Sequence, residues 1–191
     1  GGSTFNVVKV NEDQYLIADG TPGLKIASSR LNQLNNLTQA DLERLTGSHS
    51  LRDIIKIDNN TLWLSSQTNG LFKVTLQQGN WQKSKHYLAK AHVRSLYKDN
   101  NTLWVATEGR GLYQINLTND SIREISTPKD LRALLSFLPL NNGQLLIGTT
   151  NGVLVYSKEE SLLIKRVTAV NGAIWAMAQD SNDNIWLGSH W

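Results

Sequence analysis

The sequence contains no cysteine, only three prolines and a single methionine among its 191 residues. Without cysteine, the chain can form no disulfide, no thiolate metal site and no cysteine nucleophile. No apolar run approaches the roughly 18 residues that a transmembrane helix needs, and the first residues lack the basic and apolar regions of a signal peptide. We therefore expect no direct insertion of this chain into a membrane.

Charge is also sparse, because only 18% of the residues are charged and the formal net charge is +3. No run of lysine or arginine resembles a nucleic-acid-binding arm. We therefore expect no nucleic-acid partner. We also expect no bound metal and no cofactor. Hydrophobic residues make up 40% of the chain, which is typical of an ordered globular protein.

What the chain does contain is a repeated phrase. It reads LWLSSQTNGL at residues 62–71 and LWVATEGRGL at residues 103–112. Diverged copies are YLIADGTPGL at 15–24 and LLIGTTNGVL at 145–154, and IWLGSHW at 185–191 begins a fifth. The glycine near the end of each full copy is Gly23, Gly70, Gly111 or Gly152, and these are spaced by 47, 41 and 41 residues. A period in the forties is typical of β-propeller blades or of helical arrays.

Within each repeat, short runs of Leu, Ile, Val and Trp are bounded by Asn, Asp and Gly. Around the copy at residues 145–154, for example, the runs are residues 131–135, 145–148 and 153–156. Such runs predict antiparallel strands joined by tight turns, with glycine where the backbone needs a positive φ. The fold class is therefore predicted as all-β, a β-propeller segment of about four and a half four-stranded blades in an incomplete ring. Trp63, Trp104 and Trp186 are expected to fill the space between blades.

The repeat also predicts the domain boundaries. Residues 1–3 read as a cloning remnant, and the blades follow at 4–48, 49–90, 91–128 and 129–170, with the first two strands of a truncated fifth at 171–191. The longer first step predicts a short helix near 38–46, because Thr38 and Asp41 approximate a capping box and Gly47 is a plausible stop. We expect the open sheet edges to meet the remaining blades of a parent protein or a second copy of the chain.

The phrases IIKIDNNTLWLSSQTNGLFKV, SLYKDNNTLWVATEGRGLYQI and AMAQDSNDNIWLGSHW resemble the two-component regulator propeller repeat. The resemblance covers nearly the whole chain, including an arginine that opens the innermost strand of three blades. It implies a periplasmic sensor region of a hybrid histidine kinase or diguanylate cyclase, anchored in the inner membrane in the intact receptor. It also implies a non-catalytic, ligand-sensing segment whose ligand is an oligosaccharide or another small molecule.

Candidate ligand-binding residues follow from the propeller pattern, in which the start of the innermost strand and the turn after the second strand share one face. The predicted residues are Arg52, Arg94, Arg132, Trp175, His92, Glu108 and Arg110. A ring of guanidinium groups can bind anionic or sugar ligands through forked hydrogen bonds. The structural alternative is that each arginine pairs with backbone carbonyls or carboxylates of its own blade.

Two other functions compete with ligand sensing. The first is a scaffold propeller whose face binds protein and whose edges mediate dimerisation. The second is a propeller lyase or hydrolase, for which His92 with Glu108 is the pair to test first. The four histidines show no metal-ligand spacing, and the sequence contains no G-x-S-x-G nucleophile motif.

Overall fold

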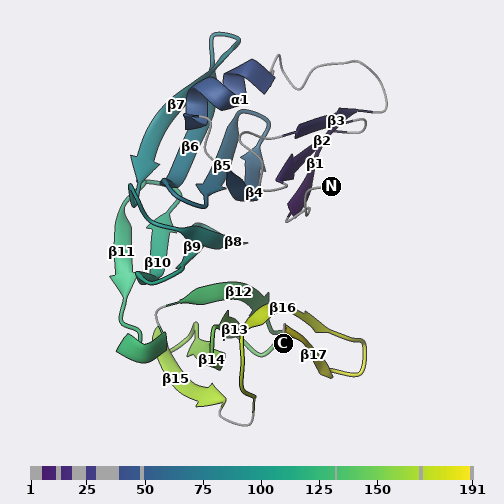
Figure 1. Cartoon of the computed structure of the whole chain (residues 1–191), viewed down its shortest axis with the longest axis vertical. Coiled ribbons are helices and arrows are strands. Elements are labelled where there is room, and N and C mark those ends of the chain that lie inside the picture. Colours follow the sequence, from purple (N-terminus) through teal and green to yellow (C-terminus); the bar gives the residue numbers. More distant parts are fainter. Residues whose placement is uncertain are drawn as a thin grey trace. The chain divides into compact units, whose positions relative to one another are not determined.

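The computed structural model describes residues 6–11, 14–18, 25–28, 39–47, 50–131, 133–167 and 170–189. The chain divides into two compact units, Gly1–Val93 and Arg94–Trp191. Nearly all of the regular structure is antiparallel β-sheet, as the strand pattern predicts (Figure 1). We number the five sheets as blades 1 to 5 in chain order.

Blades 1 and 2 form the first unit. Blade 1 has the strand order β1-β2-β3, with β1 at Asn6–Asn11, β2 at Gln14–Ala18 and β3 at Lys25–Ser28. Blade 2 has the order β4-β5-β6-β7, with β4 at Leu51–Asp58, β5 at Thr61–Ser66, β6 at Gly70–Gln77 and β7 at Asn80–Tyr87. Strand β4 packs against β1 and β2. The repeated phrase of blade 2, residues 62–71, covers most of β5 and the turn into β6.

Helix α1 spans Gln39–Thr46, within the segment that lengthens the first repeat step. It is followed by Gly47, whose φ is +70° and whose N–H donates to the carbonyl of Glu43 at 2.8 Å. A left-handed glycine with such a bond is a common helix C-cap. Leu45 is buried and packs in the same core as Trp81, so α1 lies against β7 (Figure 1).

Blades 3, 4 and 5 follow in order along the chain. Blade 3 consists of β8 at Val93–Asp99, β9 at Thr102–Thr107, β10 at Gly111–Asn116 and β11 at Ile122–Ile125. Blade 4 consists of β12 at Leu134–Pro139, β13 at Gln144–Thr149, β14 at Gly152–Ser157 and β15 at Leu162–Val167. Blade 5 consists of β16 at Ile174–Gln179 and β17 at Ile185–Ser189.

Blade 4 begins differently from the prediction. The sequence pattern assigns residues 131–135 to its first strand, but Lys129–Leu131 forms a short 3-10 helix and β12 begins only at Leu134. The N–H of Leu131 donates to the carbonyl of Pro128 at 3.0 Å. Proline holds its own φ near the helical value, so it favours a turn at this point over an extended strand.

The repeated tryptophan of blade 3 packs between blades, as predicted. Trp104 on β9 is 3% exposed, and its ring meets Tyr156 of β14 edge-on with the ring centroids 4.8 Å apart. In blade 4 the same position is Leu146, which is buried in a cluster with Ile174 of β16. Trp186 on β17 differs, because 65% of it is exposed.

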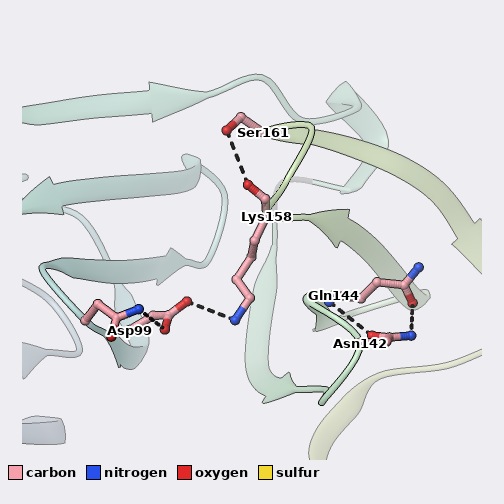
Figure 2. A network of polar contacts seen from close by, with 6 residues as sticks. Asp99, Asn142, Gln144, Lys158 and Ser161 are labelled. Atoms are coloured by element: carbon pink, nitrogen blue, oxygen red, sulfur yellow. Dashed lines mark hydrogen bonds and ion pairs between the residues drawn. The ribbon is translucent and has the colours of Figure 1, made fainter.

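A second link between blades 3 and 4 is an ion pair at the turns. Lys158, which follows β14, donates from Nζ to Oδ2 of Asp99 at the end of β8, over 2.9 Å (Figure 2). Both side chains are about one-quarter exposed. The pKa of nearby Tyr97 is raised, mainly because the phenol is partly buried and secondly because Asp99 is negatively charged. The positive charge of Lys158 lowers this pKa by a smaller amount. The pair thus joins two blades at a partly solvated position.

The turn between β16 and β17 is organised by the carboxylate of Asp180. Its Oδ1 accepts from the N–H groups of Asn182 and Asn184, each at 2.9 Å. Its Oδ2 accepts from Nδ2 of Asn184 at 3.0 Å and from the indole Nε1 of Trp186 at 2.9 Å. These hydrogen bonds, led by those from Asn184 and Trp186, lower the pKa of Asp180 from 3.8 to about 2.

We predict that the Asp180–Trp186 hydrogen bond persists to about pH 2. Because the folded pKa lies below the unfolded value, the stabilisation is complete above the unfolded pKa of 3.8 and is lost as pH falls through about 2. An NMR titration of the Asp180 carboxyl carbon and the Trp186 indole proton measures this directly. A midpoint near 4 for either signal would contradict the predicted hydrogen bonds.

Candidate functional site

Three of the predicted site residues lie together in the second unit. Arg94 is the second residue of β8, Glu108 follows the end of β9, and Trp175 is the second residue of β16. Because β8 and β9 are antiparallel neighbours, the start of one lies beside the end of the other. The cluster therefore joins the first and second strands of blade 3 to the first strand of blade 5.

The arginine lies between the other two side chains. Its Cζ is 4.7 Å from the ring centroid of Trp175, which is a cation–π distance. Its Nε is 3.7 Å from Oε1 of Glu108, which is an ion pair longer than a good hydrogen bond. The side chains of Arg94 and Glu108 are 19% and 32% exposed, and Trp175 is 39% exposed. The cluster is thus partly buried yet open to solvent on the indole.

The turn that presents Glu108 is held by Thr107. The Thr107 hydroxyl donates to the carbonyl of Gly111 at 2.7 Å and accepts from the N–H of Arg110 at 3.1 Å. Glu108 itself forms an isolated antiparallel bridge with Ala133, just before β12. The backbone that positions the carboxylate is therefore fixed within blade 3 and against blade 4.

Three of the other predicted residues are also described by the structure. Arg52 is half-buried on β4, and His92 is exposed just before β8; both belong to the first unit. Arg110 is exposed in the turn after Glu108. Arg132 lies outside the described residues. The ring of arginines and the pairing of His92 with Glu108 therefore stay predictions.

One residue that the sequence pattern did not single out links two loops of this face. Arg166 on β15 donates from Nη2 to the carbonyl of Asn151 at 3.1 Å, and its Nη1 lies 3.4 Å from Oδ2 of Asp130. Asp130 and Asn151 occupy the two loop types that the propeller pattern assigns to the ligand face. No sequence signal marks Arg166, because it lies on an outer strand outside the repeated phrase.

The chemistry of the cluster suits recognition of a polar ligand. An exposed indole offers a flat surface, a guanidinium donates hydrogen bonds and a carboxylate accepts them. Within the described part of the chain, no group of three or more His, Asp or Glu side chains has the geometry to hold a metal ion. The cluster therefore offers a ligand both hydrogen-bond donors and a hydrogen-bond acceptor.

Residues 169–191 match the model of the family named Two component regulator propeller. This segment is therefore similar to one repeat of that family. The matched segment covers blade 5 and includes Trp175 of the cluster. This match confirms the resemblance that the repeated phrases indicate, and it places one residue of the candidate site inside a propeller repeat.

Several solved structures are similar to this chain over almost its whole length. The extracellular domain of the putative hybrid two component system BT3049 from B. thetaiotaomicron is 16% identical, covers 99% of this chain and has a TM-score of 0.72. That of BT4673 from the same organism is 16% identical over 98%, with a TM-score of 0.70. PorZ, a surface component of the type-IX secretion system of Porphyromonas gingivalis, is 18% identical over 98%, with a TM-score of 0.71.

At these identities the likeness establishes the fold alone. The β-propeller domain of Myceliophteria thermophila Cps50 (Swd1) is 12% identical over 99% of this chain with a TM-score of 0.64, and this likeness confirms the predicted β-propeller architecture. This chain spans 26% of the BT3049 chain, 25% of the BT4673 chain and 31% of the PorZ chain. Among curated proteins, no sequence matches it. In the described part of the chain, no helix has the length and apolarity needed to cross a membrane.

Proposed function

We propose that this propeller segment senses a small ligand outside the cytoplasm and belongs to a bacterial signal-transduction receptor. The observation that carries the proposal is the convergence of Arg94, Glu108 and Trp175 from two blades on one partly exposed cluster. The likeness to extracellular domains of two component systems supports the extracytoplasmic location. The segment acts by binding, and it passes the signal to a domain of the larger protein.

The ligand class that best fits this cluster is a neutral or weakly charged oligosaccharide. A sugar ring has a C–H face that stacks on an indole and hydroxyl groups that accept from guanidinium and donate to carboxylate. The opposite charges of Arg94 and Glu108 offset one another, so the cluster has no strong preference for a highly charged ligand. Trp175 provides the stacking surface and the other two side chains fix the orientation of the hydroxyls.

A thermal-shift screen of the chain with a panel of oligosaccharides tests this proposal. A ligand that binds only the folded state raises the melting temperature by mass action. We expect Trp175→Ala to abolish the shift, and Arg94→Gln to reduce it, without unfolding the blade. If Arg94→Gln unfolds the protein instead, then this arginine stabilises its own blade and is not a ligand-binding residue.

The matched controls are Trp186→Ala and Arg123→Gln. Trp186 is an exposed tryptophan on β17, and Arg123 is an exposed arginine on β11 that donates to Gln114. Both variants should keep the full ligand-induced shift. Equal loss of the shift in the controls and in the cluster variants would contradict the site, and no shift with any oligosaccharide would contradict the ligand class.

A further inference from the structure

An open cavity lies in the first unit, between helix α1 and strand β7. Its volume is about 530 Å³, within the range of small-molecule sites. Of the residues that the structure describes, those that line it are Arg44, Leu45, Asn80, Trp81, Gln82 and Lys83. Leu45 and Trp81 are buried, at 1% and 2% exposure, so they form a fixed base against which the polar side chains stand. Figure 1 shows α1 beside β7 at this place.

The described lining of the cavity is positively charged. Two of its six lining residues, Arg44 and Lys83, are cations, and none of the six is acidic. The carboxylate of Asp41 lies nearby on α1, where it bonds to Arg44 rather than lining the cavity. A ligand in this cavity therefore meets two cations and two amide side chains but no carboxylate from the lining residues.

Arg44 is held in place by two hydrogen bonds from a single nitrogen. Its Nη2 donates to Oδ1 of Asp41 at 3.1 Å and to the carbonyl of Trp81 at 2.9 Å. Within the described part of the protein, Nη1 and Nε of Arg44 make no hydrogen bond. The side chain is 59% exposed. The guanidinium is thus oriented by the protein and still has donors directed away from its two partners.

Two further donors, Lys83 and Gln82, lie next to this guanidinium on β7. Lys83 forms no ion pair with any described residue, and its Nζ lies 5.8 Å from the ring centroid of Phe72. The amide of Gln82 makes no hydrogen bond to the described residues. Strand β7 is the outermost strand of its sheet, so these side chains stand at the rim of blade 2.

From this donor set we propose that the α1–β7 cavity is a binding site for a small anionic ligand bearing a carboxylate, sulfate or phosphate group. Arg44 binds the anion through its positive charge and through charge-assisted hydrogen bonds from Nη1 or Nε, because both hydrogens of Nη2 are taken by Asp41 and Trp81. Lys83 contributes the second positive charge and Gln82 a neutral donor. The site lies in the first unit, whereas the Arg94–Glu108–Trp175 cluster lies in the second, so the two proposals stand or fall separately.

Titration of the whole chain with sodium sulfate, inorganic phosphate and citrate, at constant ionic strength, tests the site. The readout is the set of amide chemical shifts by NMR, which reports both affinity and location. We expect saturable shifts confined to residues of α1 and β7 with at least one of the three anions. Stronger binding of citrate than of both inorganic anions assigns the site to an organic carboxylate, and the reverse assigns it to sulfate or phosphate.

Arg44→Gln and Lys83→Gln should each weaken the binding by tenfold or more. The matched controls are Arg123→Gln on β11 and Lys165→Gln on β15, which remove one exposed cation from an outer strand elsewhere and should leave the affinity unchanged. Lys83→Gln leaves the Arg44–Trp81 hydrogen bond intact, so it tests the site even if Arg44→Gln loosens α1. Non-saturable shifts, or equal losses in cavity and control variants, would overturn the proposal.

Discussion

Replacing Gly70 with alanine lowers the free energy of unfolding of blade 2 by about 3 kcal/mol. Gly70 has a φ of +78°, which an L-residue with a Cβ adopts at a cost of about 1 kcal/mol. A Cβ at this position would also collide with the carbonyl oxygens of Tyr87 and Leu88 and lie 2.7 Å from the Leu88 carbonyl carbon. These atoms belong to the backbone of the segment that links blade 2 to blade 3. They cannot move aside as the end of a flexible side chain would.

The same blade contains a matched control. Gly79 has the same φ of +78°, but an added Cβ would meet no atom within 4 Å. Gly79→Ala should therefore lower the free energy of unfolding only through the strain of a positive φ, by about 1 kcal/mol. Urea denaturation of both variants separates the two contributions by difference. Equal losses of stability would mean that the close approach of the link contributes nothing.

Replacing Trp104 with alanine destabilises the second unit by about 3–5 kcal/mol. The indole is 3% exposed and packs with Leu134, Leu145 and Tyr156 of blade 4. Its removal leaves a cavity between two blades that the rigid sheets fill only in part. Denaturation of the variant, followed by the fluorescence of the remaining tryptophans and by circular dichroism, measures the loss.

Trp186→Ala is the comparison, because Trp186 occupies the same place in the repeated phrase. It is 65% exposed and its indole N–H bonds to Asp180, so its loss costs less than about 1.5 kcal/mol. Trp104→Phe adds a second comparison. Trp104 Nε1 is buried and has no hydrogen-bond partner among the described residues, so phenylalanine loses ring volume but no hydrogen bond. A loss for Trp186→Ala as large as for Trp104→Ala would contradict packing between blades as the reason for the repeat.

The blades could be predicted because every repeat places apolar residues and glycine at the same positions. Glycine at a fixed place predicted a positive φ, and Gly70, Gly111 and Gly152 have φ values of +78°, +86° and +92°. The sequence could not reveal the second reason for these glycines, which is the close passage of the link to the next blade. That contact depends on where residues about 15 to 18 positions later in the chain pass the turn.

The candidate sites differ in how far the sequence could predict them. Arg94 and Trp175 share a register position, so the repeat placed both at the start of an innermost strand. The cavity beside α1 had no such signal, because it depends on a helix outside the repeat. Its central hydrogen bond joins Arg44 to Trp81 across 37 residues, and nothing in the local pattern of either segment indicates the other.

The ligand-sensing proposal is tested most directly by fluorine NMR of the chain labelled with fluorotryptophan. The chain contains six tryptophans, and the fluorine signal that is missing in Trp175→Phe belongs to Trp175. We predict that an oligosaccharide that raises the melting temperature shifts the Trp175 signal in a saturable way, leaves the exposed Trp186 unchanged, and loses this effect in Glu108→Gln. An oligosaccharide that binds the chain while the Trp175 signal stays fixed would contradict the site.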